Sequence, residues 1–378
     1  RMADVPETPN PSARNAPQPA PIEGRVLRLL DASLNRATEG ARVVEDYTRF
    51  VLDDRLLTEA AKRLRHGLAE ASAAFGYEDR LAARDTQSDV GTTFTLASEA
   101  TRATLGDVCV ASLERLQQAL RSLEEYSKAV SPGTAGRFES LRYSTYSLAK
   151  SIAAGRRGTA LLARSRLYVL IDGGASEADF IAFVAPLCAA GVHVLQLRDK
   201  RLGDRELLGR ARRLVEATAN TETLAIINDR PDIARLSGAD GVHVGQDELS
   251  VSDARAITGP QTLIGVSTHS PAQLKQAIAD GANYVGLGPT FPSTTKRFDS
   301  FPGTEYLRHA AGATSLPAFA IGGVTPENLD EVLGAGIRRI AVASAVTEAD
   351  DPAAAAKRLL ERLEATQSDD AEADATEA

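Results

Sequence analysis

Eight short apolar runs, rich in Val and Ile, recur through the second half of this 378-residue chain. They lie at 167–171, 192–197, 224–228, 241–244, 263–266, 283–287, 317–321 and 339–343. Their starts are 17 to 34 residues apart, and sequence typical of helices, such as 271–280 and 326–333, fills the intervals. The pattern therefore predicts an α/β fold, a (β/α)8 TIM barrel of about 200 residues at the small end of the usual size range.

A doubly wound open sheet is the alternative arrangement of alternating strands and helices. Such sheets usually have fewer strands and carry a glycine-rich fingerprint after the first strand. The first run here is followed by Asp172 and two glycines, without that fingerprint. The barrel is therefore the favoured prediction.

The first half of the chain has a helical period instead. From Arg25 to about Ala154, apolar residues recur every three or four positions, which predicts an all-α N-terminal domain. The polar stretch 85–94 is expected to be a loop between two of its helices. We expect a helical domain at 24–155, a Gly-Arg-Arg-Gly-containing linker at 156–166 and the barrel at 167–366. The Pro-rich segment 1–23 and the acidic tail 367–378 are expected to be disordered.

Composition excludes several classes of protein. The net charge is −8, which argues against a nucleic-acid partner. Cys109 and Cys188 are far apart and have no disulfide-framework or zinc spacing. The longest apolar run, 180–195, is interrupted and too short for a membrane span, and no signal peptide is recognisable. We therefore expect a cytoplasmic protein that acts on small molecules, with no nucleic-acid or membrane partner.

In such barrels, the chemistry lies where the strands end at their carboxyl side. The second run leads into Gln196, Arg198 and Lys200, which alternate and so share one face if the strand continues. Two cations and an amide there suit a diphosphate, although a solvated charged edge has the same pattern. Only seven of the 43 basic residues are lysines, and two of them, Lys200 and Lys296, follow strands. This bias favours the anion site.

Carboxylates follow the third and fourth runs. Asp229 ends the third, and Asp247 and Glu248 follow the fourth. Two hard oxygen ligands at neighbouring strand ends can hold one Mg²⁺ that bridges to phosphate oxygens. The residues do not decide whether Asp247 or Glu248 is the second ligand.

Small residues follow the last two runs. Gly322-Gly323 and Ala343-Ser344 occupy the positions of the phosphate site that is common in these barrels. Hydroxyl donors at 293–295 lie in the long loop after the sixth run. His193 and His243 lie inside predicted strands and are expected to be packed rather than catalytic, and His269 is a minor candidate.

Together these motifs resemble the thiamine phosphate synthase family. The matching segments are QLRDK (196–200), IND (227–229), GVHVGQDEL (241–249), IGVSTHS (264–270), YVGLGPTFPSTTK (284–296), AIGG (320–323) and VASAV (342–346). The resemblance covers essentially all of 167–346. It implies a transferase of thiamine biosynthesis that joins 4-amino-2-methyl-5-hydroxymethylpyrimidine diphosphate to a thiazole phosphate, carboxylated or not. The products are thiamine phosphate and diphosphate, with CO2 where the thiazole is carboxylated.

The resemblance also implies roles for individual residues. The pyrimidine diphosphate is expected on Gln196, Arg198, Lys200, Asn228, Ser267 and Lys296, with Arg198, Ser267 and Lys296 acting in catalysis. The thiazole phosphate is expected on Ser293, Thr295, Gly323, Ala343 and Ser344, and Mg²⁺ on Asp229 and Glu248. The family usually has Asp at position 248 and Thr at 293, and both departures keep the functional group.

Two other functions stay open for the barrel. The related thiazole tautomerases generally lack the complete sets of cations that this sequence retains. A non-catalytic barrel that senses thiamine precursors is the other alternative. Release of diphosphate in a single turnover separates an enzyme from a sensor.

The helical half has its own resemblance, carried by 28–54 and 84–92. These segments are similar to a helical domain fused to some of the synthases and proposed to be an alternative hydroxymethylpyrimidine phosphate kinase. Asn35, Glu39, Arg42 and Asp46 share one helical face, either as part of a site or as a solvated surface. A dimerisation module, and with it a homo-oligomer, is the competing interpretation.

Overall fold

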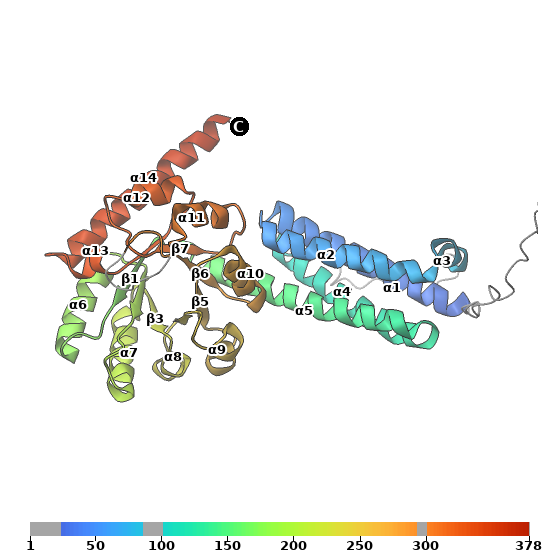
Figure 1. Cartoon of the computed structure of the whole chain (residues 1–378), viewed down its shortest axis with the longest axis horizontal. Helices are drawn as coiled ribbons and strands as arrows, with labels where there is room; N and C mark the ends of the chain where they lie inside the picture. The colour runs from blue at the N-terminus through green and yellow to red at the C-terminus, as the bar shows by residue number, and fades with distance from the viewer. Residues whose placement is uncertain (1–23, 86–100, 293–300, 378) are drawn as a thin grey trace, which may run out of the picture.

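The chain forms an elongated molecule with a helical bundle at one end and a barrel at the other (Figure 1). This computed structural model describes residues 24–85, 101–292 and 301–365 with their side chains, and 366–377 by their backbone. The predicted disordered segment 1–23 lies outside the described residues, as does most of the predicted loop 85–94.

The N-terminal half is all-α, as predicted. Its elements are α1 (Gly24–Phe50), α2 (Arg55–Ser72), η2 (Ala73–Phe75), α3 (Tyr77–Ala83), α4 (Leu105–Val130) and α5 (Pro132–Leu161). The helix α1 packs between α2 and α4, and α5 packs against the same two helices. The apolar residues spaced three and four apart, such as Leu30, Leu34 and Leu120, are buried together in the bundle core. Burial of this stripe is what holds the four long helices together.

The C-terminal half is a closed barrel of eight parallel strands in sequential order. The strands are β1 (Leu167–Ile171), β2 (Val194–Leu197), β3 (Leu224–Asn228), β4 (Gly241–Val244), β5 (Leu263–Thr268), β6 (Tyr284–Leu287), β7 (Ala318–Ile321) and β8 (Ile340–Val342). Each lies within two residues of the predicted run, so the predicted (β/α)8 fold is confirmed.

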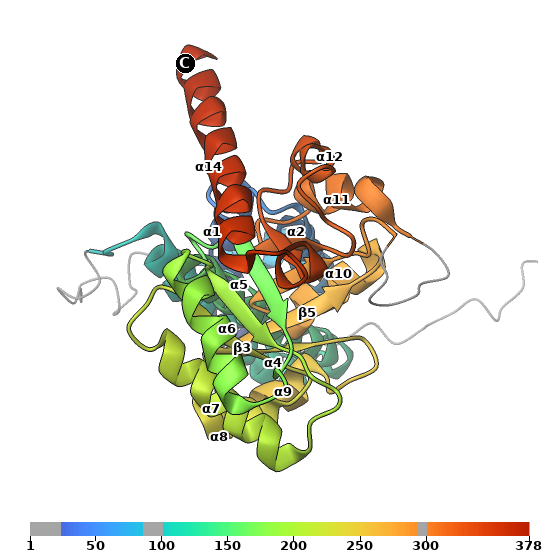
Figure 2. The same ribbon diagram turned by 90° about the vertical axis from the view of Figure 1, so that its left-hand side faces the viewer.

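Helices cover the outside of the barrel (Figure 2). They are α6 (Glu177–Ala189), α7 (Asp204–Thr218), α8 (Pro231–Ser237), α9 (Val251–Thr258), α10 (Pro271–Asp280), α11 (Gly303–Ala311), α12 (Leu329–Gly334), α13 (Ser344–Thr347) and α14 (Pro352–Glu377). Several begin at a Ser whose hydroxyl accepts from a first-turn N–H, as Ser270 does from Gln273. The strands are therefore buried on both faces, which explains their continuous apolar sequence.

Large aromatic rings fill the barrel interior. Tyr168, Tyr284 and Phe319 point inward from β1, β6 and β7, with ring centroids 5.3 to 6.1 Å apart. Glycines make room for them: a Cβ on Gly265 would lie 2.1 Å from the Tyr284 ring. Small and large inward residues are thus matched across neighbouring strands.

The helical bundle is docked on the end of the barrel where the strands begin. The amide nitrogen of Leu56 donates to the carbonyl of Ala313 before β7, and the Asn283 side chain before β6 donates to the carbonyl of Ala154. Asp54, at the start of α2, accepts from Leu57 N and from Thr314 Oγ1. Apolar residues of α1, α2, α4 and α5 join the same buried cluster as the barrel residues. The two halves therefore share a continuous core.

Two predicted boundaries differ from the structure. The segment 156–166 was expected to be a linker, but α5 continues through it to Leu161. Gly158 lies within α5 and packs against the backbone of Asn283. A glycine at this position therefore permits a close contact and does not mark a flexible joint. The tail 367–378 was expected to be disordered, but α14 continues to Glu377. Its Ala and Glu residues are strong helix formers.

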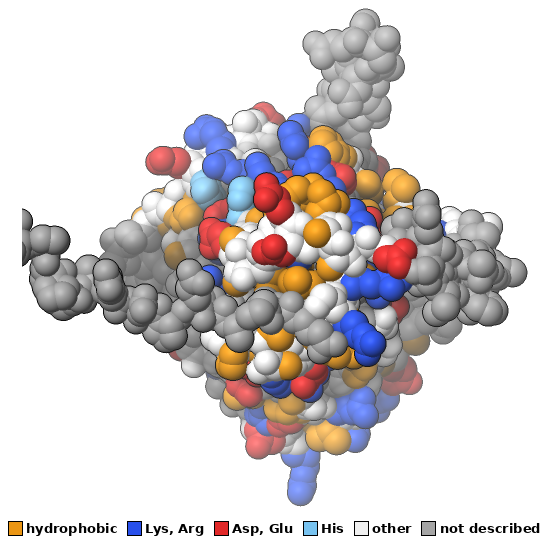
Figure 3. Space-filling view, turned by 90° about the vertical axis from the view of Figure 1, so that its right-hand side faces the viewer, with side chains coloured by type: hydrophobic (Ala, Val, Ile, Leu, Met, Phe, Trp, Pro, Cys, Tyr) orange, Lys and Arg blue, Asp and Glu red, His pale blue; other side chains and the backbone are white. Residues whose placement is uncertain are grey.

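The outer end of the bundle carries basic, acidic and apolar side chains interspersed (Figure 3). None of the described helices combines the length and apolarity that crossing a membrane requires.

Candidate active site

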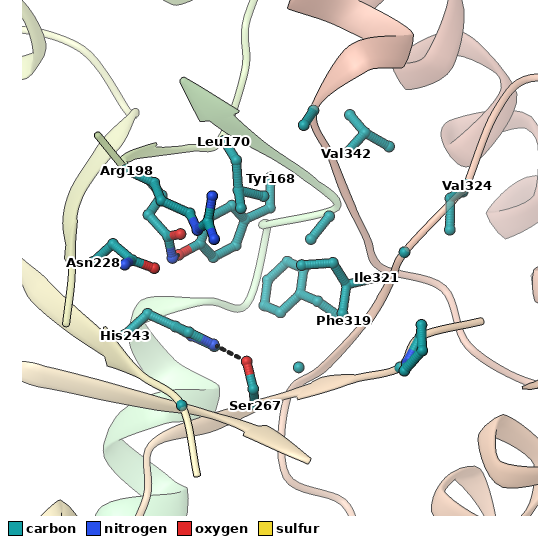
Figure 4. Close-up of a pocket in the computed structure, with 18 of the residues that line it drawn as sticks. Tyr168, Leu170, Arg198, Asn228, His243, Ser267, Phe319, Ile321, Val324 and Val342 are labelled. Carbon is teal, nitrogen blue, oxygen red and sulfur yellow. Dashed lines mark hydrogen bonds between the residues drawn. The ribbon is translucent and has the colours of Figure 1, made fainter. Parts of the chain in front are cut away.

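A pocket of about 520 Å³ opens where the barrel strands end. All eight strands, or the residues directly after them, contribute to its lining, and its described lining includes no residue of the helical bundle. Arg198, Asn228, His243 and Ser267 lie on one side, and Phe319, Ile321 and Val324 lie on the other (Figure 4). The pocket therefore has a polar half and an apolar half.

The predicted trio of Gln196, Arg198 and Lys200 lines this pocket. Gln196 is buried and its amide nitrogen donates to the Tyr168 hydroxyl at 2.6 Å. Arg198 is half-buried, and the Lys200 side chain is 63% exposed at the rim. The expected placement of two cations and an amide at the barrel mouth is thus observed.

Asp199 lies between Arg198 and Lys200 in the sequence, but it is not among the residues that line the pocket. Its carboxylate accepts from the backbone N–H groups of Gly173 and Arg201 and from the Arg201 guanidinium. The hydrogen bonds from Arg201 hold the pKa of this buried carboxyl well below its usual value. Asp199 therefore ties the loop after β1 to the loop that carries Arg198 and Lys200.

Asp229 and Glu248 come together at the ends of β3 and β4. The Lys200 ammonium lies 3.5 Å from Asp229 Oδ2 and 4.0 Å from Glu248 Oε1. The amide of Asn228 donates to Asp229 Oδ2 at 2.6 Å, and the Asp229 backbone adopts a left-handed φ of 59°. Asp247 also lines the pocket and is exposed. The Lys200 ammonium therefore lies near both the Asp229 and the Glu248 carboxylates.

This donor set fits a hard divalent cation. No three His, Cys, Asp or Glu side chains of the described ranges are grouped closely enough to hold a metal by themselves. Mg²⁺, however, is commonly bound through one or two carboxylates, with waters and substrate phosphates completing its shell. Two carboxylates beside a cationic rim provide that arrangement.

The opposite rim carries the small residues of β7 and β8. Gly322 and Gly323 adopt left-handed φ values of 94° and 65°, which favour glycine. A Cβ on Gly323 would lie 2.5 Å from the carbonyl oxygen of Pro292, so any larger residue is excluded there. Ala343 and Ser344 line the pocket beside them, at the start of α13.

Three predicted residues, Ser293, Thr295 and Lys296, lie outside the described residues. Their roles stay predictions. The described part of the same loop, Thr290 and Phe291, is hydrogen-bonded to the carbonyls of Ile321 and Gly322.

Sequence reasoning missed a buried polar series at the base of the pocket. Tyr168 and Tyr284 hydroxyls lie 3.2 Å apart, and Tyr284 lies 3.2 Å from His243 Nδ1. His243 Nε2 lies 2.9 Å from the Ser267 hydroxyl (Figure 4). These side chains lie within strands rather than after them. The signal that could have found them is glycine alternating with large polar residues inside a strand, as in Gly241-Val-His243.

The histidines differ in their surroundings. His243 is packed inside the barrel as predicted, and burial lowers its pKa to about 4, so its imidazole is neutral at pH 7. His193 precedes β2 rather than lying in it, and its Nδ1 accepts from the N–H groups of Arg166 and Leu167. His269 lines the pocket and its Nδ1 meets the carbonyl of Gly288.

The candidate face of the helical domain is exposed. Asn35, Glu39 and Arg42 are exposed, and Arg42 pairs with Asp46 at 3.3 Å. The opposite side of α1 is buried as predicted. The four residues share one face, and the arrangement of Arg42 and Asp46 is that of an ordinary surface ion pair.

Fold and site define a class of protein: a (β/α)8-barrel enzyme with a built-in place for phosphorylated small molecules at its mouth. A family model described as thiamine monophosphate synthase matches residues 167–346, and one described as ThiD2 family matches 28–151. The chain belongs to the thiamine-phosphate synthase family, whose members are transferases.

Individual relatives agree over most of the chain. A thiamine-phosphate synthase from Rhodopirellula baltica is 44% identical, over 89% of this chain and 93% of its own. One from Gloeobacter violaceus is 42% identical, over 89% of this chain and 97% of its own. A solved thiamine phosphate pyrophosphorylase from Pyrococcus furiosus is 31% identical, with a TM-score of 0.47 over 53% of this chain and 95% of that chain. The reaction of this family depends on a metal ion.

Proposed function

We propose that the barrel joins 4-amino-2-methyl-5-hydroxymethylpyrimidine diphosphate to a thiazole phosphate and releases diphosphate and thiamine phosphate. The observation that carries this proposal is the juxtaposition at one rim of Arg198 and Lys200 with Asp229 and Glu248, facing Gly323 across the pocket. The first rim suits a diphosphate with its metal ion, and the second suits a single phosphate.

The substrates are assigned to the two rims. Gln196, Arg198, Lys200, Asn228, Ser267 and Lys296 hold the pyrimidine diphosphate. Ser293, Thr295, Gly323, Ala343 and Ser344 hold the thiazole phosphate. Asp229 and Glu248 would hold Mg²⁺, which when bound would supply positive charge to stabilise the departing diphosphate.

The residues then act by position and charge. The bond between the pyrimidine methylene and the diphosphate oxygen breaks, and its electron pair leaves with the diphosphate. Arg198, Lys200 and Lys296 stabilise the charge that builds on that leaving group. The amino group of the pyrimidine helps the ring bear the positive charge that develops on the methylene. The thiazole nitrogen, positioned by its phosphate anchor, donates its lone pair to the methylene carbon and forms the new bond.

Lys296→Ala is the direct test of this assignment. We expect turnover to fall by about two orders of magnitude or more, because a cation that stabilises the leaving group is lost. The measurement is diphosphate release by the purified full chain with both substrates. Lys357→Ala, an exposed lysine of α14, is the matched control and should keep normal turnover.

Three outcomes would redirect the assignment. Near-normal turnover of Lys296→Ala would exclude the proposed cation role. Binding of the pyrimidine diphosphate by the wild-type chain without diphosphate release, even in a single turnover, would favour the sensor. Conversion of a thiazole phosphate isomer without use of the pyrimidine would favour the tautomerase.

We propose that the helical domain phosphorylates the pyrimidine monophosphate and so supplies the barrel's substrate, with dimerisation as the alternative. Its match to a separate family over 28–151, and a barrel pocket built from barrel residues among those described, support a function of its own. The full-length Lys296→Ala chain tests this, because it should accumulate pyrimidine diphosphate from the monophosphate and ATP. No accumulation, together with a dimeric mass in solution, would favour the dimerisation module.

We also propose that the chain works in a reducing compartment, the cytoplasm. The support is chemical: Cys109 and Cys188 are both free thiols in the structure. Burial raises the pKa of the Cys109 thiol to about 11, so it is an unreactive packing residue.

A further inference from the structure

Five buried or half-buried side chains form one uninterrupted series of hydrogen bonds across the barrel. The series runs from Gln196 to Tyr168 at 2.6 Å, to Tyr284 at 3.2 Å, to His243 Nδ1 at 3.2 Å and, from Nε2, to Ser267 at 2.9 Å. Both ends, Gln196 and Ser267, line the pocket. The three middle members are at most 8% exposed. All five members line the pocket, although little of the surface of the middle three is accessible.

The number of hydrogens fixes the direction of the series. Gln196 donates to the Tyr168 oxygen through its amide nitrogen, and the Tyr284 hydroxyl is the other partner of that oxygen, so the Tyr168 hydrogen has an acceptor within the series only if it is donated to Tyr284. The Tyr284 hydrogen then goes to His243 Nδ1. A neutral imidazole that accepts at Nδ1 carries its hydrogen on Nε2, and that hydrogen is donated to Ser267.

We propose that this series makes Ser267 a hydrogen-bond donor toward the bound substrate, with Tyr168, Tyr284 and His243 as positioning residues. Ser267 already accepts from His243, so its own hydrogen is left for the ligand. This inference rests on the proposed function. It assigns the Ser267 hydrogen to an oxygen of the departing diphosphate.

The same count of donors and acceptors determines what Gln196, at the other end of the series, offers to the ligand. Gln196 uses its nitrogen on Tyr168, so its carbonyl oxygen is left to accept from the ligand. If every hydrogen bond of the series were reversed, the Gln196 amide would have to rotate so that its oxygen accepts from Tyr168. Ser267 would then donate to His243 and offer the ligand a lone pair instead of a hydrogen. The site therefore selects a ligand with a donor, such as an amino group, at one end and an acceptor oxygen at the other. An aminopyrimidine diphosphate has this polarity.

Nitrogen-15 NMR of the full chain with labelled histidine tests the direction without any substrate. We expect His243 to be neutral, protonated on Nε2 and unprotonated on Nδ1. Its resonances are identified by their loss in His243→Gln. Protonation of Nδ1 in the resting protein would overturn the proposal.

Tyr284→Phe breaks the series at its centre. We expect both tautomers of His243 to become populated, because Nδ1 loses its donor. Tyr306→Phe is the matched control: it removes another buried phenol, one that donates to Thr268 outside the series. It should leave the His243 tautomer unchanged. A Tyr284→Phe spectrum identical to that of the wild type would also overturn the proposal.

Kinetics give the second readout. We expect Tyr284→Phe to lower kcat about ten- to a hundredfold, with KM for the pyrimidine diphosphate changed by less than about threefold. Tyr306→Phe should keep both constants, and His243→Gln, which restores a donor near the Nε2 position, should exceed His243→Ala. If Tyr284→Phe fails to fold, Tyr168→Phe breaks the series one step earlier. A chain that makes no thiamine phosphate would refute the proposed function while leaving the NMR result to decide the direction.

Discussion

Lys200 lies beside two carboxylates, Asp229 and Glu248, that we propose as metal ligands. Its ammonium lies within 4.0 Å of both Asp229 and Glu248, but its side chain is 63% exposed. An ion pair this exposed contributes about 0–1 kcal/mol, so a divalent cation bound as proposed would displace it at little cost. In that proposal, the released Lys200 would be free to turn toward the diphosphate.

Glu248→Gln and Asp229→Asn should each raise the Mg²⁺ concentration needed for half-maximal turnover, by about tenfold or more, because each removes one charged ligand. Asp247→Asn is the matched control and should leave that concentration unchanged. Turnover measured against Mg²⁺ concentration checks all three. A larger effect from Asp247→Asn than from Glu248→Gln would assign the ligand to the neighbouring residue.

Asp199 gives the barrel a pH-dependent contribution to stability. Its folded pKa lies below the unfolded value, so the contribution is complete above the unfolded pKa of about 4 and is lost as the pH falls below it. We expect Asp199→Asn to lower the free energy of unfolding by about 2 kcal/mol at pH 7. Urea unfolding at pH 7 and pH 3 measures the difference.

The control for this prediction is Asp172→Asn. Asp172 also contacts Arg201, at 2.9 Å, but its side chain is 61% exposed, so its removal should cost less than about 1 kcal/mol. A deficit of Asp199→Asn that is the same at both pH values would contradict the assigned cause.

At the scale of the strand, glycines set which rings the barrel can hold. Gly265 faces Tyr284 so closely that no other residue fits, and Tyr284 in turn contacts His243. The inner layer is therefore specified by pairs of residues on neighbouring strands. A change in one strand is transmitted to the polar series in another.

Gly265→Ala should lower the free energy of unfolding by about 1–3 kcal/mol, because the Tyr284 ring has to move. Gly209→Ala is the control: it lies in α7 with open space around it and should raise stability by about 0.5–1 kcal/mol. Urea unfolding of both variants is the measurement. Equal effects of the two substitutions would show that Tyr284 tolerates the added methyl group.

The elements were predictable because their signals are local. Buried strands such as 167–171 and 224–228 match the structure residue for residue, since full burial leaves an uninterrupted apolar run. The place of Arg198 and Asp229 in the pocket lining was predictable from the general rule about strand ends. Tyr284 and His243 were not, because their contacts join strands separated by some forty residues.

The prediction of a linker at 156–166 was limited for the same reason, because the contact that matters joins residues far apart in the sequence. A Gly-Arg-Arg-Gly stretch has the composition of a flexible joint, but Gly158 is required by a contact with Asn283, 125 residues further along the chain. The position of Lys200, 4.0 Å from Glu248 Oε1, bears on the open choice between Asp247 and Glu248 and likewise cannot be read from the sequence. Distances between elements carry this information, and single-sequence patterns do not.

At the scale of the whole molecule, α5 passes from the bundle directly onto the barrel. Gly158 lies against the Asn283 backbone, where a Cβ would be 1.9 Å from the carbonyl oxygen. The side-chain amide nitrogen of Asn283 donates to the carbonyl of Ala154, and its side-chain oxygen accepts from the N–H of Ile264 in β5. The junction between α5 and the barrel is therefore closely packed, because Asn283 contacts both the bundle helix and a barrel strand.

Gly158→Ala and Gly155→Ala test this junction in one helix. We expect Gly158→Ala to destabilise the chain by about 1–3 kcal/mol, because its methyl group collides with backbone. Gly155→Ala meets only Leu316, at 3.6 Å, and should be neutral or stabilising by up to about 1 kcal/mol. Urea unfolding and protease cleavage near residue 160 are the measurements. Similar behaviour of the two variants would mean that the bundle can shift on the barrel.

The bundle is docked where the strands begin, while the pocket opens where they end. An intermediate made on the bundle would have to travel around the barrel through bulk solvent before it could react. Its isotopic label would then be diluted by unlabelled pyrimidine diphosphate added to the solution, and thiamine phosphate would appear after a lag that shortens as the enzyme concentration rises. If the bundle has the kinase activity proposed for it, the covalent connection would secure equal numbers of the two activities, and the intermediate would pass between them by free diffusion.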